Sequence, residues 1–105
     1  MIEKSPREVK DIIDNAKNDP MILDVREQWE YDICHIENST LIPMGKIASV
    51  SGEININMKI IVVCHHGIRS RMVAKYLTSK GFSDVINLTG GIDAWSLNID
   101  PSMPK

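Results

Sequence analysis

Short apolar runs alternate along this chain with segments in which apolar residues recur every three or four positions. Mainly apolar runs occupy positions 21–25, 60–63 and 85–88, and a weaker run occupies 40–43. Runs of this length, bounded by polar or turn-forming residues, are typical of strands that are covered on both faces. The pattern therefore predicts four short strands.

The first helix has a clear start signal. Ser5 is expected to cap it, with Pro6 in the first helical position and Glu8 three residues after the cap, which together form a capping box. The apolar positions that follow at helical spacing are Val9, Ile12, Ile13 and Ala16. This helix is expected to end near 18–20, where a proline occurs.

Further helices are predicted downstream. A short helix is expected over 27–33, one or two turns over 46–50, and a last helix from 90–91 onward. The longest helix follows the segment 64–70 and ends before Gly81, a residue type that favours helix C-termini. Its expected apolar face comprises Met72, Val73, Tyr76 and Leu77.

Alternating strands and helices are typical of an α/β domain with a mainly parallel sheet. Ligands of such sheets bind beyond the carboxyl ends of the strands. Cys64 directly follows the run 60–63, and Asp24 and Arg26 lie at the end of the run 21–25. The pattern therefore predicts that these polar residues share the functional edge of the sheet.

Length and composition predict one soluble domain over 1–105, in which 98–105 is expected to be a loosely ordered tail. Apolar residues make up 43% of the chain and charged residues 25%, which are ordinary values for a globular protein. The formal net charge is −2 and no stretch is densely basic, so neither nucleic acid nor a membrane surface is an expected partner.

The expected compartment is the cytoplasm. The first ten residues are polar and do not resemble a signal peptide, and the longest apolar run, 60–64, is far too short to span a bilayer. The two cysteines, Cys34 and Cys64, do not form a disulfide framework. Free thiols in a reducing cytosol are the simpler interpretation, with a single disulfide between them as the alternative.

Cys64 is the strongest candidate for a reactive side chain. A thiol between a buried strand and a helix start is favoured as the thiolate, because backbone N–H groups and the helix dipole stabilise negative charge there. Arg69 adds a positive charge, and Gly67 lets the backbone curl so that several amides converge on one anion. The thiolate is the nucleophilic form. The alternative is an inert cysteine that ends a core strand.

Three motifs carry a resemblance to a known family. Segment 64–70, Cys-His-His-Gly-Ile-Arg-Ser, has the pattern C-x-x-G-x-R-S, and segment 88–95 contains G-G-x-x-A-W. Segment 23–43 contains Leu-Asp-Val-Arg, followed by Glu30-Tyr31, His35-Ile36 and Ile42-Pro43. In this order and spacing the motifs resemble those of the rhodanese family, and they extend over most of the chain.

The resemblance implies a rhodanese-like domain with a mainly parallel five-stranded sheet flanked by helices, in which Ile2 contributes a short first strand. It also implies a sulfurtransferase (a thiosulfate sulfurtransferase-type enzyme) that moves sulfane sulfur from a small anionic donor to a thiophilic acceptor through a Cys64 persulfide. Thiosulfate is the default donor; a protein persulfide, glutathione persulfide or mercaptopyruvate-like donor is an alternative. The acceptor is cyanide, a thiol or a sulfur-carrier protein.

The same resemblance assigns roles to individual residues. Cys64 is the expected nucleophile, the loop amides cradle the terminal sulfur and the donor's oxyanion, and Arg69 binds the anion. The expected substrate-binding residues are thus His65, His66, Gly67, Ile68, Arg69 and Ser70. Asp24 and Arg26 are expected to form an internal ion pair or hydrogen-bond network that orders loops at this edge. A directly catalytic role for them is the alternative.

No metal and no cofactor is expected. Adjacent histidines on a tight loop, His65 and His66, point in different directions, and no C-x2-C or H-x3-H spacing is present. They are expected to shape the pocket mouth and modulate its charge. His35 is expected to be a hydrogen-bonded structural residue. Core or helix-packing positions are expected for Trp29, Tyr31 and Trp95.

One position departs from the family pattern, because Cys34 stands where the family usually has a glycine before His-Ile. Glycine there normally serves the backbone conformation, so the geometry of the turn before His35 is an open point. A buried, inert Cys34 is favoured, and resolution of a persulfide or sulfenate on Cys64 is the alternative.

Two other functions remain as alternatives. A cysteine phosphatase or arsenate reductase on the same fold typically needs C-x5-R, whereas Arg69 gives C-x4-R and Ser70 stands at the arginine position. The smaller loop suits one sulfur atom better than a phosphate. The other alternative is a non-catalytic rhodanese-like binding or regulatory module, since a fold does not fix function.

Overall fold

The structure is a computed structural model that describes residues 1–17 and 19–104. Within these ranges, five parallel strands form a sheet in the order β1-β5-β4-β2-β3. They are β1 (Ile2–Lys4), β2 (Met21–Asp24), β3 (Thr40–Leu41), β4 (Ile60–Val63) and β5 (Val85–Leu88). The predicted α/β class, the five-stranded parallel sheet and the first strand at Ile2 are confirmed.

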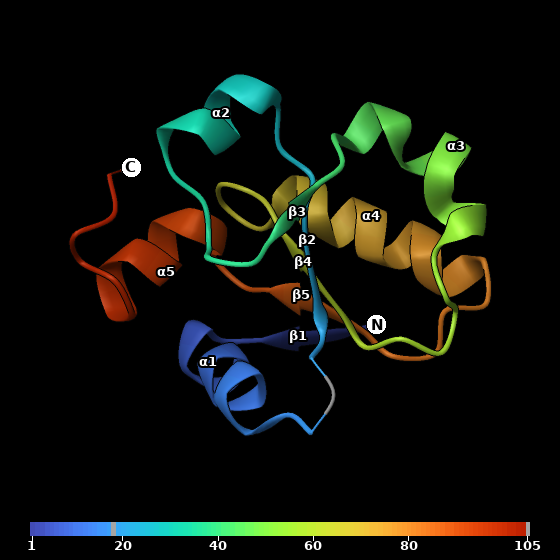
Figure 1. Cartoon of the computed structure of the whole chain (residues 1–105), viewed down its shortest axis with the longest axis horizontal. Coiled ribbons are helices and arrows are strands. Elements are labelled where there is room, and N and C mark those ends of the chain that lie inside the picture. Colours follow the sequence, from blue (N-terminus) through green and yellow to red (C-terminus); the bar gives the residue numbers. More distant parts are fainter. Residues whose placement is uncertain (18, 105) are drawn as a thin grey trace.

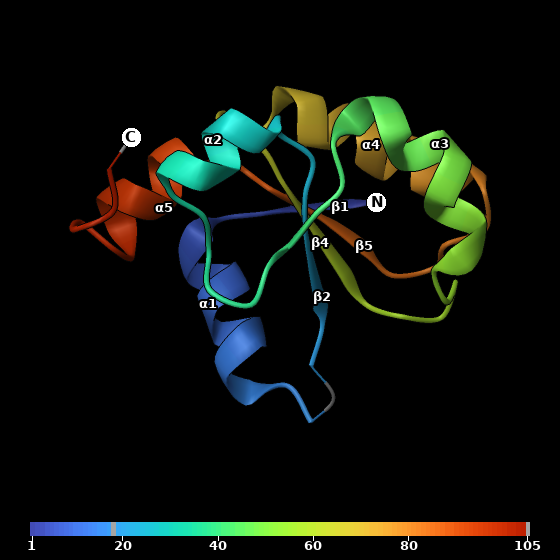
Figure 2. The same cartoon turned by 45° about the horizontal axis from the view of Figure 1, so that its top comes forward.

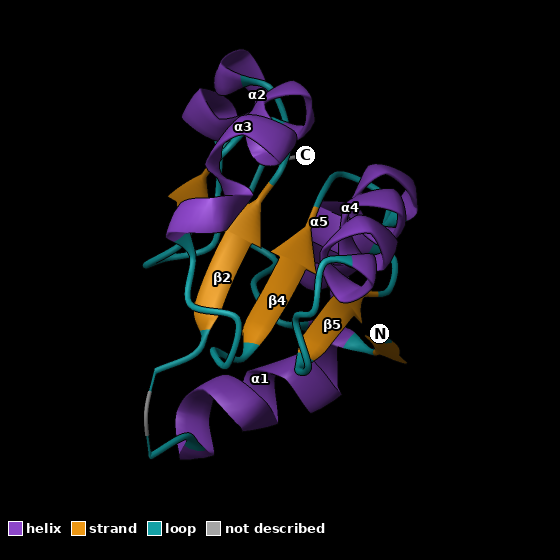
Figure 3. Ribbon diagram, turned by 90° about the vertical axis from the view of Figure 1, so that its right-hand side faces the viewer, coloured by secondary structure: helices purple, strands orange, loops and turns teal. Residues whose placement is uncertain are grey.

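Helices cover both faces of the sheet (Figure 1). On one face pack α1 (Pro6–Asn15) and α5 (Gly91–Asn98), and on the other pack α3 (Ile47–Val50) and α4 (Ile68–Ser79). Figure 2 shows α3 and α4 on one side of the strands and α1 on the opposite side. The strand arrows in Figure 3 point toward the end at which α2 (Gln28–Ile33) lies. Short 3₁₀ turns flank α3 at Met44–Lys46 and Ser51–Glu53.

The central strands are mainly apolar because both of their faces are covered. Leu23, Ile60 and Val62 pack in the core cluster beneath α3 and α4, whereas Ile22 and Ile61 pack in the cluster beneath α1 and α5. Each of these side chains is at most 4% exposed. Burying a side chain of this size stabilises the fold by about 1.5–3 kcal/mol. The sheet is therefore a rigid support for the loops at its carboxyl edge.

The predicted capping box starts α1. The Glu8 amide donates to Ser5 Oγ at 3.2 Å, and the Ser5 amide donates to Glu8 Oε1 at 2.9 Å. A cap of this kind is worth about 1 kcal/mol. The helix ends at Asn15, earlier than the expected 18–20, of which residue 18 lies outside the described residues.

The predicted apolar face of α4 is wrong at one position. Val73 and Leu77 are buried and Tyr76 is partly buried, but Met72 is 56% exposed. The buried stripe includes Ser70, Val73, Ala74 and Leu77, which follows the spacing of one helix face, and position 72 falls outside it. The helix also begins at Ile68, so the last three residues of the segment 64–70 are helical.

Trp29 is 66% exposed, so the core or helix-packing position predicted for it is wrong. The helix that carries it, α2, has six residues, and Glu30 is its buried residue. A helix this short at the edge of the sheet leaves its other faces in solvent. Trp95 is 5% exposed and lies in the core as predicted, and the ring of Tyr31 stacks on His35 with ring centroids 3.8 Å apart.

After α5 the described chain continues to residue 104. The Ser96 hydroxyl donates to the Met103 carbonyl at 3.0 Å, and the Met103 side chain packs against the core cluster beneath α1 and α5. Residue 105, the end of the predicted tail, lies outside the described residues. Among the described helices, none has the length and apolar character that crossing a membrane requires.

Candidate active site

Adjacent strands bring the predicted site residues to one edge of the sheet. Parallel pairing sets Asp24 of β2 beside Val63 of β4, and the Val25 amide donates to the Val63 carbonyl at 2.9 Å. Cys64 follows Val63 directly. Arg26 and Cys64 therefore leave the sheet at the same level, as expected for neighbouring strands that point the same way.

The loop after β4 turns back on the Cys64 sulfur. The Gly67 amide donates to Cys64 Sγ at 3.0 Å. Gly67 has φ +95°, a left-handed conformation that side chains rarely adopt. A Cβ at this position would also lie 3.1 Å from the Gly90 nitrogen. Glycine is thus required at the point where the loop enters α4.

Hydrogen bonds to the sulfur favour the thiolate of Cys64. Burial raises the pKa of this thiol, since the residue is 1% exposed. Hydrogen bonds that the Ser70 hydroxyl and the amides of Ser70, Gly67 and His66 donate to the thiolate lower the pKa, and their combined effect is the larger one. The pKa of Cys64 is therefore lower than the ordinary pKa of a thiol, as expected for an anion held at a helix N-terminus.

The N-terminus of α5 supports the other side of the loop. The Ile92 amide donates to the Cys64 carbonyl at 2.8 Å, and the Asp93 amide donates to the His65 carbonyl at 3.0 Å. Gly91, the first residue of α5, has φ +58°, and a Cβ there would overlap the Cys64 carbonyl oxygen. The sequence indicated only that glycines open this helix; the structure shows that Gly91 makes room for the loop.

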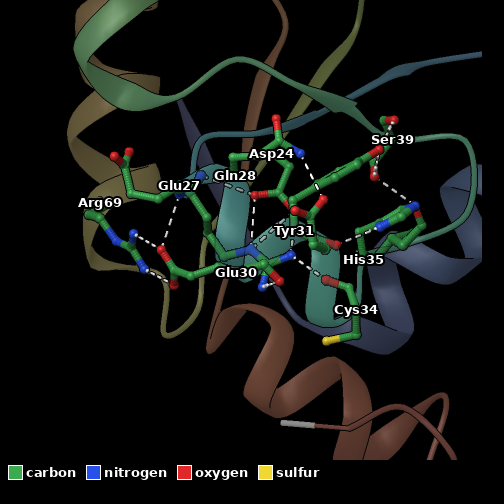
Figure 4. A network of polar contacts seen from close by, with 12 residues as sticks. Asp24, Glu27, Gln28, Glu30, Tyr31, Cys34, His35, Ser39 and Arg69 are labelled. Carbon is green, nitrogen blue, oxygen red and sulfur yellow. Dashed lines mark hydrogen bonds and ion pairs between the residues drawn. The ribbon is translucent and has the colours of Figure 1, made fainter.

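Arg69 is bound by a carboxylate from α2. Its two terminal nitrogens donate to Glu30 Oε1 at 2.7 Å and to Oε2 at 2.8 Å, a bidentate pair that Figure 4 shows. The Arg69 guanidinium lowers the pKa of Glu30 to about 2, although burial opposes this. Glu30 in turn raises the pKa of Arg69. Glu30 belongs to the segment 23–43 that resembles the family's first motif, but no local pattern indicates Arg69 as its partner.

Asp24 and Arg26 form the predicted internal ion pair. Arg26 Nη2 donates to Asp24 Oδ2 at 2.8 Å, and the two side chains are 2% and 1% exposed. Arg26 also donates to the Cys34 carbonyl at 2.7 Å and to the Glu30 carbonyl at 3.4 Å. The pair therefore holds α2 and the segment after it against the end of β2.

The two loop histidines contact each other edge to face, with ring centroids 4.2 Å apart. Burial and the neighbouring His66 lower the pKa of His65. In residues 1–17 and 19–104 there is no group of three His, Cys, Asp or Glu side chains arranged to hold a metal ion. The Ile68 side chain, at the start of α4, is 65% exposed.

Cys34 occupies the family's glycine position without strain. Its φ is −165° and its ψ is 153°, an extended conformation that any residue adopts. The thiol donates to the Pro104 carbonyl at 2.8 Å. His35 Nδ1 lies 2.8 Å from the Tyr31 carbonyl, which agrees with the predicted hydrogen-bonded histidine. The turn therefore does not need the glycine.

Asn87 lies beside the site but was not among the residues predicted from the sequence. It lies in the middle of the apolar run 85–88, is fully buried, and its side chain bonds the Gly67 carbonyl and the Ser70 hydroxyl. A polar residue in an otherwise apolar strand was the available signal, since buried amides need partners.

A pocket of about 210 Å³ lies beside the loop. Its lining residues are Arg26, Trp29, Glu30, Ile33, Cys34 and His65. A larger hollow of about 670 Å³ lies between α1, α5 and the segment after α2, away from Cys64. The smaller pocket borders the Cys64 loop through His65.

Comparison with known proteins agrees with this geometry. The Rhodanese-like domain family model matches residues 5–98. A putative sulfur carrier protein, YrkF of Bacillus subtilis, is 41% identical over 75 residues, which is 71% of this chain and 40% of that protein. The thiosulfate sulfurtransferase GlpE of Coxiella burnetii is 38% identical over 79 residues, covering 75% of this chain and 74% of GlpE.

The fold has close counterparts among solved structures. A rhodanese-like domain protein from Staphylococcus aureus superposes with a TM-score of 0.83 at 34% identity, covering 90% of this chain and 91% of that one. The matched family region contains β2, the Cys64 loop and the glycines that open α5. The chain belongs to the rhodanese-like family.

Proposed function

We propose that the chain is a sulfurtransferase that carries sulfane sulfur as a persulfide on Cys64. The observation that carries the proposal is the hydrogen bond from the Gly67 amide to Cys64 Sγ, in a loop that starts a helix behind a buried strand. The relatives YrkF and GlpE are named as a sulfur carrier and a thiosulfate sulfurtransferase. These names support the same class of chemistry.

The first half-reaction loads the cysteine. The Cys64 thiolate attacks the outer sulfur of thiosulfate, a new S–S bond forms, and the S–S bond of thiosulfate breaks. Sulfite leaves with the electron pair of that bond, and Cys64 becomes a persulfide anion. Loop amides and the N-terminus of α4 stabilise the negative charge on the outer sulfur.

The second half-reaction regenerates the thiolate. A nucleophile such as cyanide, a thiolate or a cysteine of a carrier protein attacks the outer sulfur. The persulfide bond breaks and its electron pair returns to Cys64, so cyanide leaves as thiocyanate. No cofactor is needed, because each half-reaction exchanges one sulfur–sulfur bond for another bond to the same sulfur atom.

Arg69 is the proposed side chain for the anionic donor. Two of its N–H groups bind Glu30, and a guanidinium has five, so others remain for an oxygen of thiosulfate. The Glu30 carboxylate fixes the guanidinium plane and partly neutralises its charge. Arg69 is therefore proposed to orient a dianionic donor and to release sulfite once the charge has moved to Cys64.

The test is the rate of thiocyanate formation from thiosulfate and cyanide. Wild type and Cys34→Ser are expected to be equally active, and Cys64→Ser is expected to be inactive. The Cys34 variant is the matched control, because it also removes one thiol while leaving the loop intact. Equal thiocyanate formation by Cys64→Ser and wild type would overturn the proposal.

A further inference from the structure

A buried amide lies directly beneath the Cys64 loop. Asn87 Nδ2 donates to Glu3 Oε1 at 2.7 Å and to the Gly67 carbonyl at 3.2 Å. Asn87 Oδ1 accepts a hydrogen bond from the Ser70 hydroxyl. Asn87 and Ser70 are both 0% exposed. One side chain thus joins β1, the loop and the first turn of α4.

The neighbours of this amide fix its orientation. The Glu3 carboxylate and the Gly67 carbonyl can only accept hydrogen bonds, so both must face the NH₂ group of Asn87. The amide oxygen therefore faces Ser70, and the Ser70 hydroxyl must be the donor. Glu3 is itself held by Arg71 Nε. The hydrogen bonds therefore form a chain in which the Ser70 hydroxyl donates to Asn87 and the Asn87 amide donates to the Glu3 carboxylate.

The Ser70 hydroxyl has two acceptors for one proton. Asn87 Oδ1 is the acceptor in the structure. The Cys64 sulfur is the other, because a hydrogen bond from the same hydroxyl lowers the pKa of the thiol. A hydroxyl group donates a single hydrogen bond. The two acceptors therefore compete for this hydrogen bond. The hydroxyl donates to the sulfur only when negative charge makes the sulfur the better acceptor.

We propose that Asn87 is a positioning residue that restrains the reactivity of Cys64 by competing for the Ser70 proton. While Ser70 donates to Asn87, it offers Cys64 only lone pairs, which favour the protonated thiol. When the sulfur becomes anionic, the thiol proton has gone to solvent and the hydroxyl turns to donate to the sulfur. The Ser70 proton stays on Ser70 throughout.

This inference deepens the proposed function and rests on it, because it concerns the anionic forms of Cys64 that sulfur transfer uses. In that scheme the hydroxyl donates to the thiolate and to the persulfide, and it returns to Asn87 when the cysteine is protonated. Asn87 therefore sets how much of the resting protein carries the thiolate.

The test is a double-mutant cycle between Asn87 and Ser70, read from the ultraviolet absorbance of the thiolate against pH. All variants carry Cys34→Ser, so that the signal comes from Cys64. Asn87→Val, which places an apolar β-branched residue in the strand, is expected to lower the Cys64 midpoint while Ser70 is present. Below the midpoint, the thiolate fraction is expected to rise by roughly tenfold, the lower end of what one hydrogen bond to a charged group contributes.

In the Ser70→Ala background the same substitution is expected to give no lowering. Loss of the Asn87 bond to the Gly67 carbonyl occurs in both backgrounds and cancels in the cycle. Equal midpoint changes in the two backgrounds, or a larger lowering without Ser70, would overturn the proposal. Thermal unfolding of each variant identifies any that do not fold.

Glu3→Ala is the second variant if Asn87→Val does not fold. Glu3 lies on the edge strand β1, its side chain is 37% exposed, and it orients the Asn87 amide. Its removal takes away a negative charge in both backgrounds, so the midpoint is expected to fall further in the Ser70 protein than in Ser70→Ala; equal changes again overturn the proposal. The substitutions at 70 and 87 leave in place the other charged groups around the loop, namely Asp24, Arg26, Glu30, His65, His66, Arg69, Arg71 and Asp93.

Failure of this inference is distinguishable from failure of the proposed function. The thiolate titration needs neither donor nor acceptor, so it reports on Asn87 even in a protein that transfers no sulfur. An additive cycle with normal thiocyanate formation overturns the role of Asn87 alone. Absence of thiocyanate formation overturns the proposed function, while the cycle still decides the role of Asn87.

Discussion

Glu30 and Arg69 lie 39 positions apart in the sequence and form a bidentate ion pair, with N–O distances of 2.7 and 2.8 Å. The pair links α2 to the first turn of α4, on either side of the Cys64 loop. The position of Arg69, the proposed anion-binding residue, therefore depends on α2, a helix outside the segment 64–70.

The pair makes the protein sensitive to acid. An unfolded Glu30 has the ordinary pKa of 4.5 and the folded one a pKa of about 2, so its stabilisation is complete above 4.5 and is lost as the pH falls toward 2. Because Arg69 is 35% exposed, we expect about 1–2 kcal/mol after solvent screening. Urea unfolding at several pH values measures this.

Glu30→Gln is the matched variant for that measurement. It is expected to be less stable than wild type at neutral pH and to lose less stability between pH 4.5 and 2. Parallel acid profiles for the two proteins would contradict the assignment.

Arg69→Lys tests the geometry of the guanidinium separately from its charge. A lysine keeps the positive charge but cannot bind Glu30 and an oxyanion through a planar fork. We expect kcat/KM for thiosulfate to fall about tenfold, mainly through KM, with the fold unchanged. Initial rates over a range of thiosulfate concentrations measure this, and an unchanged KM would count against the role of Arg69.

Gly91→Ala is expected to destabilise the protein by about 3 kcal/mol, because the new Cβ meets backbone that cannot move aside. It would lie 2.6 Å from the His65 carbonyl oxygen, at a position with φ +58°. Gly52→Ala is the control, since a Cβ there has nothing within 4 Å, and is expected to change stability by less than about 0.5 kcal/mol. Denaturant unfolding that found equal effects would refute the close approach of loop and α5.

Arg26→Ala leaves the Asp24 carboxylate buried without its cation. Breaking a buried pair in this way costs about 3–5 kcal/mol. Lys59→Ala removes an exposed partner of Asp84, 3.1 Å away, and is expected to cost less than about 1 kcal/mol. Thermal unfolding compares the two, and a similar small effect for both would show that the Asp24 pair does not support the site.

Local patterns in the sequence predicted most of the fold. Continuous apolar runs such as 60–63 identified the buried strands, and the Ser5 capping box identified the start of α1. The prediction for Trp29 was wrong because aromatic composition does not show which face of a six-residue helix meets the core. Met72 was wrong because it lies one position away from the buried stripe of α4.

The candidate site was predictable only where it is local in sequence. Cys64, Gly67 and Arg69 share one segment, and Asp24 and Arg26 share another. The contacts of Glu30 with Arg69 and of Asn87 with Ser70 join residues 39 and 17 positions apart. Such contacts depend on strand order and helix packing, which a single sequence does not encode in any local pattern.

The central claim is tested most directly by locating a transferred sulfur atom. Protein treated with thiosulfate and freed of excess donor is weighed intact by mass spectrometry, before and after cyanide. We expect wild type and Cys34→Ser to gain the mass of one sulfur, which cyanide removes, and Cys64→Ser to gain nothing. A sulfur adduct that persists in Cys64→Ser, or one that depends on Cys34 instead, would contradict the account.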